Sequence, residues 1–390
     1  MIVKAKADQL KLLPFTDFTS VTPAIRIQDL NLNWRERDLP ERLRTKHVHR
    51  LHPYLGKFIP QLVEIFLRKY RPHLVVDPFC GSGTTLVEAV ALGINSFGAD
   101  ISEFNCLLTR VKVAEYDVDR LEKEVADILK RSFEESQLRL FEHKAPYAEG
   151  SYLEQWFAPK ALQELFAYRD LIGNYEYQDV LKIVLSRAAR SARLTTHFDL
   201  DFPKRPQIGP YQCYKHGRTC RPTETARRFL VRYSNDTVKR IREFACIRKN
   251  AEADVVCGDS RQVEFPPCDL VLTSPPYVGL IDYHEQHRYA YELLSLRQNS
   301  QAEIGSAAFG NSRKAQQTYL DQIGEVFANI KRSLTRNARL VVIVHDRKNL
   351  YPGLAKRLGF KEEVAIHRHV DRRTGRRASD FFESVFVWKA

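Results

Sequence analysis

The sequence predicts an α/β fold: a Rossmann-like doubly wound sheet with a C-terminal antiparallel hairpin and a large helical insert. A short apolar run at 74–76 leads into a glycine-rich turn, a helical pattern and a second strand that ends at Asp100. Strand, loop, helix and strand in this order begin a doubly wound parallel sheet. Mostly helical patterns then fill 104–250, and strand patterns return after it. The sheet is therefore expected to be interrupted once, by the insert.

Two further segments follow the same periodicities. Apolar residues at 59–70 recur at helical spacing behind Pro60, and a proline in the first turn is typical of a helix start. Strand patterns at 362–370 and 383–390 flank a basic turn at 371–377. Their proximity along the chain predicts the C-terminal hairpin.

These elements divide the chain into three parts. Residues 1–103 contain an N-terminal segment and the first half of the sheet domain, and 251–390 contain the second half. Residues 104–250 form the insert between them. Because an insert of this length exceeds what a connection needs, we expect it to have a function.

The composition indicates a polyanionic partner. The 390 residues carry a formal net charge of +13, from 61 Lys and Arg against 48 Asp and Glu. This surplus favours nucleic acid over solubility alone. Guanidinium groups suit phosphates and guanine edges because they offer a planar fork of donors. The arginines gather in three clusters: Arg187, Arg190 and Arg193; Arg218, Arg221, Arg227, Arg228 and Arg232; and Arg368, Arg372, Arg373, Arg376 and Arg377.

The remaining features favour a cytoplasmic location. No run of about 18 or more apolar residues appears, so no membrane span is expected. The N-terminus has lysines but neither the long apolar stretch nor the cleavage site of a signal peptide. Seven irregularly spaced cysteines favour reduced thiols over a disulfide framework.

A glycine-rich loop, called the glycine loop below, follows the first strand. Its sequence is Asp77-Pro78-Phe79-Cys80-Gly81-Ser82-Gly83-Thr84-Thr85. Glycines there let the backbone approach a ligand closely, and the helix N-terminus behind them favours negative charge. Asp100, at the end of the second strand, is placed to accept hydrogen bonds from ribose hydroxyls. An ordinary βα turn is the alternative, whereas a Walker loop is disfavoured because no Lys-Ser/Thr pair follows the glycines.

A second loop, called the Pro-Pro-Tyr loop below, is Thr273-Ser274-Pro275-Pro276-Tyr277. It follows a strand pattern that is expected to end at the same sheet edge as the glycine loop. Two prolines fix the backbone and remove two N–H donors, so carbonyls remain free to accept from an amino group. The tyrosine offers a flat face on which an extruded base stacks. A proline-rich turn is the alternative, and the pairing with the glycine loop disfavours it.

Together the two loops resemble those of the amino-methyltransferase family of bacterial DNA modification enzymes. In that family the first loop binds S-adenosylmethionine and the second is catalytic. The resemblance implies that Ser274 holds or polarises the target amine and that the Pro275 carbonyl accepts from it. It also implies that Tyr277 stacks on the flipped base, with Pro276 completing the catalytic loop. The Ser-Pro-Pro-Tyr form is similar to the N4-cytosine subgroup, whereas N6-adenine enzymes more often carry Asp or Asn first.

The resemblance also implies a cofactor site. Asp77 and Gly81 are expected near the methionine part of S-adenosylmethionine and Asp100 near its ribose. The segment 52–60 resembles the family element that closes over the methionine, although a plain helix start is the alternative. Asp259 is expected near the adenine amino group unless it merely ends a strand. The predicted cofactor-binding residues are Lys57, Phe58, Asp77, Phe79, Gly81, Ser82, Gly83, Thr84, Asp100, Asp259 and Thr273.

We therefore expect a site-specific enzyme that methylates the N4 amine of a flipped cytosine in double-stranded DNA, with S-adenosylmethionine as donor. Flipping is expected because a base inside a duplex is out of reach. The segment 104–250 is the candidate target-recognition region, although in the family this region usually follows the strand that ends at Gly258. A cognate restriction endonuclease is a candidate partner. N6-adenine or RNA methylation is the nearest alternative, ahead of a catalytically silent nucleic-acid-binding module and a protein-glutamine methyltransferase.

Possible metal ligands occur in the insert. Cys213, His216 and Cys220 follow the spacing C-x2-H-x3-C, with no evident fourth ligand nearby. Since structural zinc sites use four ligands, we expect a structured basic loop and no metal. The acidic and histidine residues after the Pro-Pro-Tyr loop are expected to form pocket walls and solvated turns: Asp282, His284, Glu285 and His287.

Overall fold

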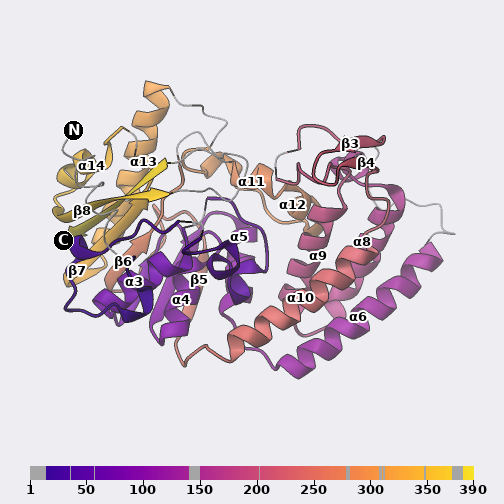
Figure 1. Ribbon diagram of the computed structural model, residues 1–390, viewed down its shortest axis with the longest axis horizontal. Coiled ribbons are helices and arrows are strands. Elements are labelled where there is room, and N and C mark those ends of the chain that lie inside the picture. The colour runs from indigo at the N-terminus through magenta and orange to yellow at the C-terminus, as the bar shows by residue number, and fades with distance from the viewer. Residues whose placement is uncertain are drawn as a thin grey trace.

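The chain forms two lobes that lie side by side along the long axis of the molecule (Figure 1). One lobe holds the main sheet and the C-terminus, and the other is mostly helical. Within the described part of the chain, no helix is long and apolar enough to cross a membrane. The computed structural model describes residues 15–35, 37–56, 58–139, 150–201, 203–277, 282–306, 310, 312–346, 348–370 and 381–390.

Seven strands of the described residues form the main sheet. They are β1 (Leu74–Asp77), β2 (Asn95–Asp100), β5 (Ala253–Cys257), β6 (Cys268–Thr273), β7 (Leu334–Val344), β8 (Lys361–Val370) and β9 (Phe381–Lys389). Their order is β5-β2-β1-β6-β7-β9-β8, parallel from β5 to β7, with β9 antiparallel to both of its neighbours. The chain changes direction across the sheet between β1 and β6. Doubly wound sheets bind ligands at the carboxyl ends of strands beside such a switch point.

Helices cover both faces of this sheet because alternate strand residues point to opposite sides. Val75 of β1 shares a core with Leu62 on one face, and Val76 shares another with Phe327 on the other. The helices of this lobe are α3 (Pro60–Tyr70), α4 (Thr84–Leu92), α5 (Glu103–Val113), α13 (Arg313–Lys331) and α14 (Tyr351–Arg357).

The predicted Rossmann-like sheet and C-terminal hairpin are confirmed, and the basic turn at 371–377 lies outside the described residues. The insert was predicted to begin at residue 104, within α5. Helix α5 packs on the sheet: the Cys106 thiol donates to the Asp100 carbonyl at 3.4 Å, and Arg110 donates to the Val255 carbonyl at 3.1 Å. The helical lobe follows α5 and begins with α6.

The helical lobe shares one continuous core with α4 and α5 of the sheet lobe. Leu162, Leu165, Ile183, Val184 and Leu230 are buried there between the helices. Helix α6 contacts α8 and α10, and α9 contacts α10 and α12. The hairpin β3–β4 stands at the upper end of this lobe in Figure 1. The elements are α6 (Val118–Arg139), α7 (Tyr152–Trp156), α8 (Pro159–Leu171), α9 (Gln178–Ala192), β3 (Tyr211–Cys213), β4 (Arg218–Cys220) and α10 (Arg227–Ala245), with α11 (Tyr283–Gln286) and α12 (Arg288–Leu294) on the path back to the sheet.

The first arginine cluster is internal, so it does not supply the phosphate-binding surface that the sequence suggested. Arg187 is buried and pairs with Asp236 at 2.6 Å. Arg190 forms an ion pair with Asp201. Arg193 is buried and packs over aromatic rings. These guanidinium groups are used to hold the helical lobe together.

The other two clusters differ from the first and from each other. Arg368 is buried and donates to the Glu383 carboxylate at 2.7 Å, while the remaining arginines of that cluster lie outside the described residues. The middle cluster is exposed throughout, on β4, the loop after it and the start of α10. Its members are Arg218, Arg221, Arg227, Arg228 and Arg232.

Candidate active site

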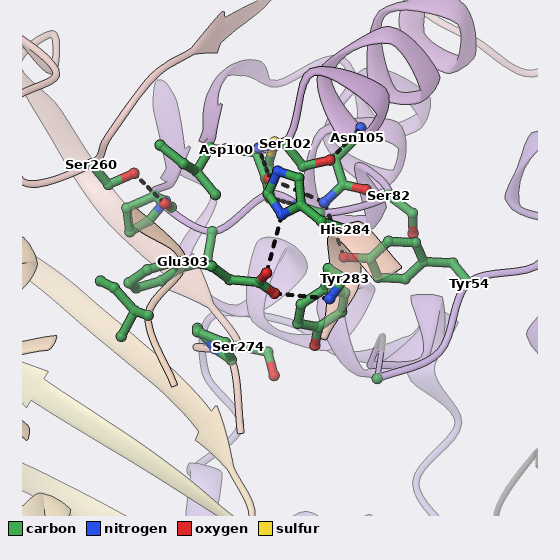
Figure 2. A pocket seen from close by; sticks show the side chains of 18 of the residues that line it. Tyr54, Ser82, Asp100, Ser102, Asn105, Ser260, Ser274, Tyr283, His284 and Glu303 are labelled. Atoms are coloured by element: carbon green, nitrogen blue, oxygen red, sulfur yellow. Dashed lines mark hydrogen bonds and ion pairs between the residues drawn. The ribbon is translucent and has the colours of Figure 1, made fainter. Parts of the chain in front are cut away.

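A pocket opens where β1, β2, β5 and β6 end, at the switch point of the sheet (Figure 2). Its lining combines polar side chains with apolar surface, as is usual for ligand pockets. Both predicted loops face it, together with residues of the segment 282–304. The predicted site residues that line it are Phe58, Phe79, Gly81, Ser82, Thr84, Asp100, Asp259, Ser274 and Pro276.

Close packing fixes the glycine loop. Gly81 and Gly83 both have positive φ, of 50° and 77°. A Cβ atom at Gly81 would lie 3.0 Å from the Tyr54 hydroxyl, and one at Gly83 would lie 2.6 Å from the Thr109 side chain. The Thr109 hydroxyl also donates to the Gly81 carbonyl at 3.0 Å. Glycine is needed at both positions, for conformation and for space.

Asp77 lies behind the pocket and joins the two loops. Its carboxylate accepts from the hydroxyls of Thr85 and Thr273, each at 2.7 Å, and from the Phe79 N–H at 3.1 Å. Burial raises the pKa of Asp77 to about 6, even though these hydrogen bonds favour the charged form. Asp77, Thr273 and Gly83 do not line the pocket, so they support its walls from behind.

Asp100 forms part of the pocket wall and organises its neighbours. Its carboxylate accepts from the backbone N–H groups of Gly81 and Ser102, each at 2.9 Å, and from the Asn105 amide at 3.0 Å. The same amide group donates to the Tyr54 hydroxyl at 3.2 Å. Burial raises the pKa of the Asp100 carboxyl above its ordinary value. One carboxylate therefore positions the glycine loop and the start of α5 together.

Two buried polar atoms of this wall lack a partner among the described residues. They are the Ser82 hydroxyl oxygen and the Asn105 side-chain oxygen. Buried polar atoms are nearly always hydrogen-bonded, so a lone pair left open in a pocket wall indicates a polar ligand. The sequence did not single out Asn105, although Ser102 capping α5 just after the second strand was a signal that could have located it.

The Pro-Pro-Tyr loop forms the opposite wall. In Figure 2, Ser274 lies at the other end of the pocket from Asp100, Ser102 and Asn105. The Tyr319 hydroxyl donates to the Pro276 carbonyl at 2.9 Å and lies 2.6 Å from the Tyr351 hydroxyl. The loop is thus anchored from behind, with the Ser274 side chain on the pocket side.

Tyr277 and Pro275 belong to the loop but do not line the pocket. Pro275 is buried. The Tyr277 hydroxyl lies 3.5 Å from the Glu383 carboxylate, and its ring centre lies 6.3 Å from that of His345. Burial and the charge of Glu383 raise the pKa of Tyr277 well above its ordinary value, so the phenol stays neutral.

The segment 282–304 supplies pocket residues that the sequence motifs missed. Glu303 accepts from the Tyr283 N–H at 2.9 Å and from His284 Nδ1 at 3.0 Å, and all three side chains line the pocket. The Tyr283 ring stacks on Tyr54 with centres 5.6 Å apart. His284 is the pocket wall that the sequence predicted. Glu303 follows no motif and becomes visible only in three dimensions.

Two further predicted cofactor residues, Phe58 and Asp259, line the pocket. Phe58 is buried just before α3 and lines the pocket. Asp259 also lines it, with its carboxylate paired to Arg261 at 2.5 Å. Lys57 lies outside the described residues.

Comparison with known proteins identifies the family. A family model described as DNA methylase matches residues 57–110. The type II methyltransferase M.MjaII of Methanocaldococcus jannaschii is 37% identical over 433 aligned positions, which cover 90% of this chain and 82% of that protein. The chain belongs to the DNA amino-methyltransferase family.

Other matches to this methyltransferase are more distant. The type II methyltransferase M.MvaI of Kocuria varians is 21% identical over 282 positions, 66% of this chain and 59% of that protein. Among solved structures, TrmN from Thermus thermophilus gives a TM-score of 0.36 at 12% identity, covering 89% of this chain and 53% of that one. The family uses S-adenosylmethionine as its methyl donor, and the open lone pairs of Ser82 and Asn105 fit a polar cofactor.

The prediction that Cys213, His216 and Cys220 have no fourth neighbour is wrong. His197 Nδ1 lies 3.8 Å from Cys213 Sγ. The chain after α9 folds back over β3, where the His197 N–H donates to the Tyr211 hydroxyl at 3.0 Å. Separation along the sequence hid this contact.

Proposed function

We propose that this methyltransferase transfers a methyl group to the N4 amine of a cytosine flipped out of double-stranded DNA. The observation that carries the proposal is the shared pocket, since Ser274 and Pro276 face the same cavity as Ser82 and Asp100. An amine held by the Pro-Pro-Tyr loop therefore meets a donor held by the glycine loop. Serine in the first position of that loop supports cytosine as the target.

The glycine-loop wall is the proposed site for the donor. Ser82 and Asn105 offer the open lone pairs, and Phe58 and Phe79 offer apolar surface. The Glu303 carboxylate, which lines the same pocket, favours a ligand with positive charge. S-adenosylmethionine, when bound, supplies an electrophilic methyl group on a sulfonium centre.

The opposite wall is proposed to hold the amine. The lone pair of a cytosine amine is conjugated with the ring, so the amine is a weak nucleophile. An acceptor at the Ser274 hydroxyl, which faces the pocket, favours a pyramidal nitrogen with its lone pair aimed across the pocket. The Pro275 carbonyl is proposed as the second acceptor, although Pro275 itself is buried and does not line the pocket. Tyr319 already occupies the Pro276 carbonyl and so fixes the loop. Catalysis then rests on positioning and electrostatics.

Tyr277 is proposed to stack on the flipped base. Its hydroxyl, near Glu383, keeps the ring in place, and the pKa raised by burial keeps it neutral. A neutral aromatic face stacks on any base, so this contact adds binding energy without choosing the base.

The helical lobe is proposed as the region that reads the target. Its exposed arginines, from Arg218 to Arg232, form a surface suited to phosphates and guanine edges. His52, beside the pocket, lies 3.2 Å from the Ser186 hydroxyl of α9, so the two lobes are in direct contact. We also propose that a restriction endonuclease with the same recognition sequence is the partner of this enzyme.

Nucleoside analysis tests the base assignment. Double-stranded DNA is incubated with the full chain and isotope-labelled S-adenosylmethionine, digested to nucleosides and analysed by mass spectrometry. Labelled N4-methylcytosine is the expected product. Labelled N6-methyladenine would overturn the base assignment but keep the DNA methyltransferase, and label found in RNA alone would overturn the DNA substrate.

A further inference from the structure

Four side chains with metal-ligating atoms meet beside the hairpin β3–β4, in the helical lobe. They are His197, Cys213, His216 and Cys220, and all of their ligand atoms lie within 4.8 Å of one another. None of them lines the pocket described above. The group therefore calls for a separate explanation.

The distances match a tetrahedral metal centre. Cys213 Sγ lies 3.8 Å from His197 Nδ1 and 3.6 Å from His216 Nδ1, and Cys220 Sγ lies 3.5 Å from His216 Nδ1. Zinc bonds of about 2.3 Å to sulfur and about 2.0–2.1 Å to nitrogen, at tetrahedral angles, put S and N about 3.6 Å apart. Two thiolates and two imidazoles are also a usual donor set for structural zinc.

We propose that His197, Cys213, His216 and Cys220 bind one structural Zn²⁺ ion. The four ligands come from the loop after α9, from β3, from the β3–β4 turn and from β4. Four protein ligands close the coordination shell, so the site is structural and leaves no position for a substrate.

The hairpin needs such a support because it has little core. Each of its strands is three residues long, and an isolated two-stranded hairpin is at best marginally stable in water. Tyr214 in the β3–β4 turn is 75% exposed, and Ile208 just before β3 is 83% exposed. The buried side chains are instead those of Cys213 and Cys220. A metal ion at this point replaces the missing core, as in other small units.

The site also fixes part of the exposed arginine cluster. Arg218 and Arg221 flank the ligand Cys220, and Lys215 precedes the ligand His216. Three of the ligands lie between residues 213 and 220, so the ion holds this basic turn in one conformation. We infer that the metal shapes a basic surface of the helical lobe.

A disulfide between Cys213 and Cys220 is the competing explanation. The β3–β4 register sets Cys213 opposite Arg218 and Tyr211 opposite Cys220, so the cysteines are not a directly opposed pair. A disulfide also leaves the convergence of both imidazoles on the same point without a role.

Metal analysis of the untagged full chain tests the proposal. Inductively coupled plasma mass spectrometry is expected to find about one zinc ion per chain, as a four-ligand site predicts. Cys213→Ser should lower that content at least about tenfold because a hydroxyl is a far poorer zinc ligand. The matched control is Cys246→Ser, since Cys246 is an exposed free thiol outside the cluster, and it should keep its zinc.

Cobalt substitution gives a readout that does not depend on the variants folding. The wild-type chain loaded with Co²⁺ is expected to show thiolate-to-cobalt charge transfer and the strong visible bands of a tetrahedral site. Both should disappear when zinc is added back.

Three results would overturn the proposal. One is a wild-type chain that takes up neither zinc nor cobalt after reduction. Another is zinc retained in full by both Cys213→Ser and Cys220→Ser. The third is the loss of two titratable thiols in the unreduced, denatured chain, which would establish the disulfide.

Discussion

The two loops that form the pocket are held in different ways. The glycine loop is fixed through its own backbone, whose Gly81 N–H and carbonyl bond to Asp100 and Thr109. The Pro-Pro-Tyr loop is fixed from behind, by Thr273 on Asp77 and by Tyr319 on the Pro276 carbonyl. The first arrangement leaves acceptor atoms open in the wall, and the second leaves the Ser274 hydroxyl and the Pro276 ring facing the cavity. Changes to the glycine loop should therefore alter cofactor affinity, and changes to the other loop should alter the rate.

The largest expected effect is on the rate, at Ser274. Ser274→Ala removes an acceptor for the amine, and loss of one such positioned group lowers kcat by about 10²–10³-fold. The Kd for S-adenosylmethionine should stay within about twofold, because the donor wall is untouched. Single-turnover kinetics and calorimetry measure the two quantities.

A matched serine serves as the control for this variant. Within the part of the chain that the structure describes, the Ser136 hydroxyl bonds to the Phe133 carbonyl of its own helix, so Ser136→Ala should leave both values unchanged. A Ser274→Ala enzyme with full kcat would contradict the role proposed for the loop.

The next largest effect is expected on cofactor affinity, at Asp100. Asp100→Ala releases the Gly81 N–H and the Asn105 amide, so the proposed donor wall should lose its shape. The Kd for S-adenosylmethionine should rise about 10- to 100-fold, as for other lost charge-assisted hydrogen bonds. At a saturating concentration of S-adenosylmethionine, the kcat of Asp100→Ala should approach that of the wild-type enzyme. Asp254 is exposed on β5, so Asp254→Ala provides the control. An unchanged Kd for S-adenosylmethionine in Asp100→Ala would exclude the proposed donor wall.

A smaller effect on the rate is expected at Tyr319, which positions the Pro-Pro-Tyr loop from behind. Tyr319→Phe removes the hydroxyl that bonds to the Pro276 carbonyl and to the Tyr351 hydroxyl. The bond to the Pro276 carbonyl is worth about 0.5–1.5 kcal/mol, or about two- to tenfold in rate. The loss should appear in kcat with little change in KM for the donor. A loss in donor affinity with an unchanged kcat would contradict this role, because it would link Tyr319 to cofactor binding and not to the Pro-Pro-Tyr loop.

The smallest effect lies outside both loops and concerns stability alone. Burial and the neighbouring His49 lower the pKa of His47 to about 2. The unfolded chain takes up a proton near pH 6.5 while the folded chain does not, so stability falls as the pH drops below 6.5. His47→Phe removes this group, and the stability lost between pH 7 and pH 5.5 should shrink by about 1 kcal/mol.

Urea unfolding at the two pH values measures this difference. The exposed His73 gives the control His73→Gln, which should leave the pH dependence unchanged. An equal pH dependence in wild type and His47→Phe would contradict the pKa argument. Neither variant should alter kcat or donor affinity, because His47 does not line the pocket.

The sequence predicted the sheet and both loops because each depends on local patterns. Gly81 and Gly83 are required by positive φ, and the two prolines by a fixed turn. A short stretch of sequence is therefore enough to recognise these residues. The C-terminal hairpin was equally local, because its two strand patterns are separated by a short stretch of sequence.

The missed residues come together only through long-range packing. Glu303 approaches the pocket from an irregular segment, and His197 reaches Cys213 across 16 residues of sequence. The sequence also could not separate exposed from buried arginines. Arg187 and Arg218 look alike along the chain, but one is paired inside the lobe and the other is exposed.

Asp77 has a consequence that goes beyond holding two loops. Its hydrogen bond to Thr273 joins residues 196 positions apart, and the one to Thr85 fixes the start of α4. The relative position of the two pocket walls is thus set when the protein folds, before any substrate arrives. The effective concentration of one bound reactant near the other is then set by the folded structure. Neither loop has to rearrange in each turnover to bring the two reactants together.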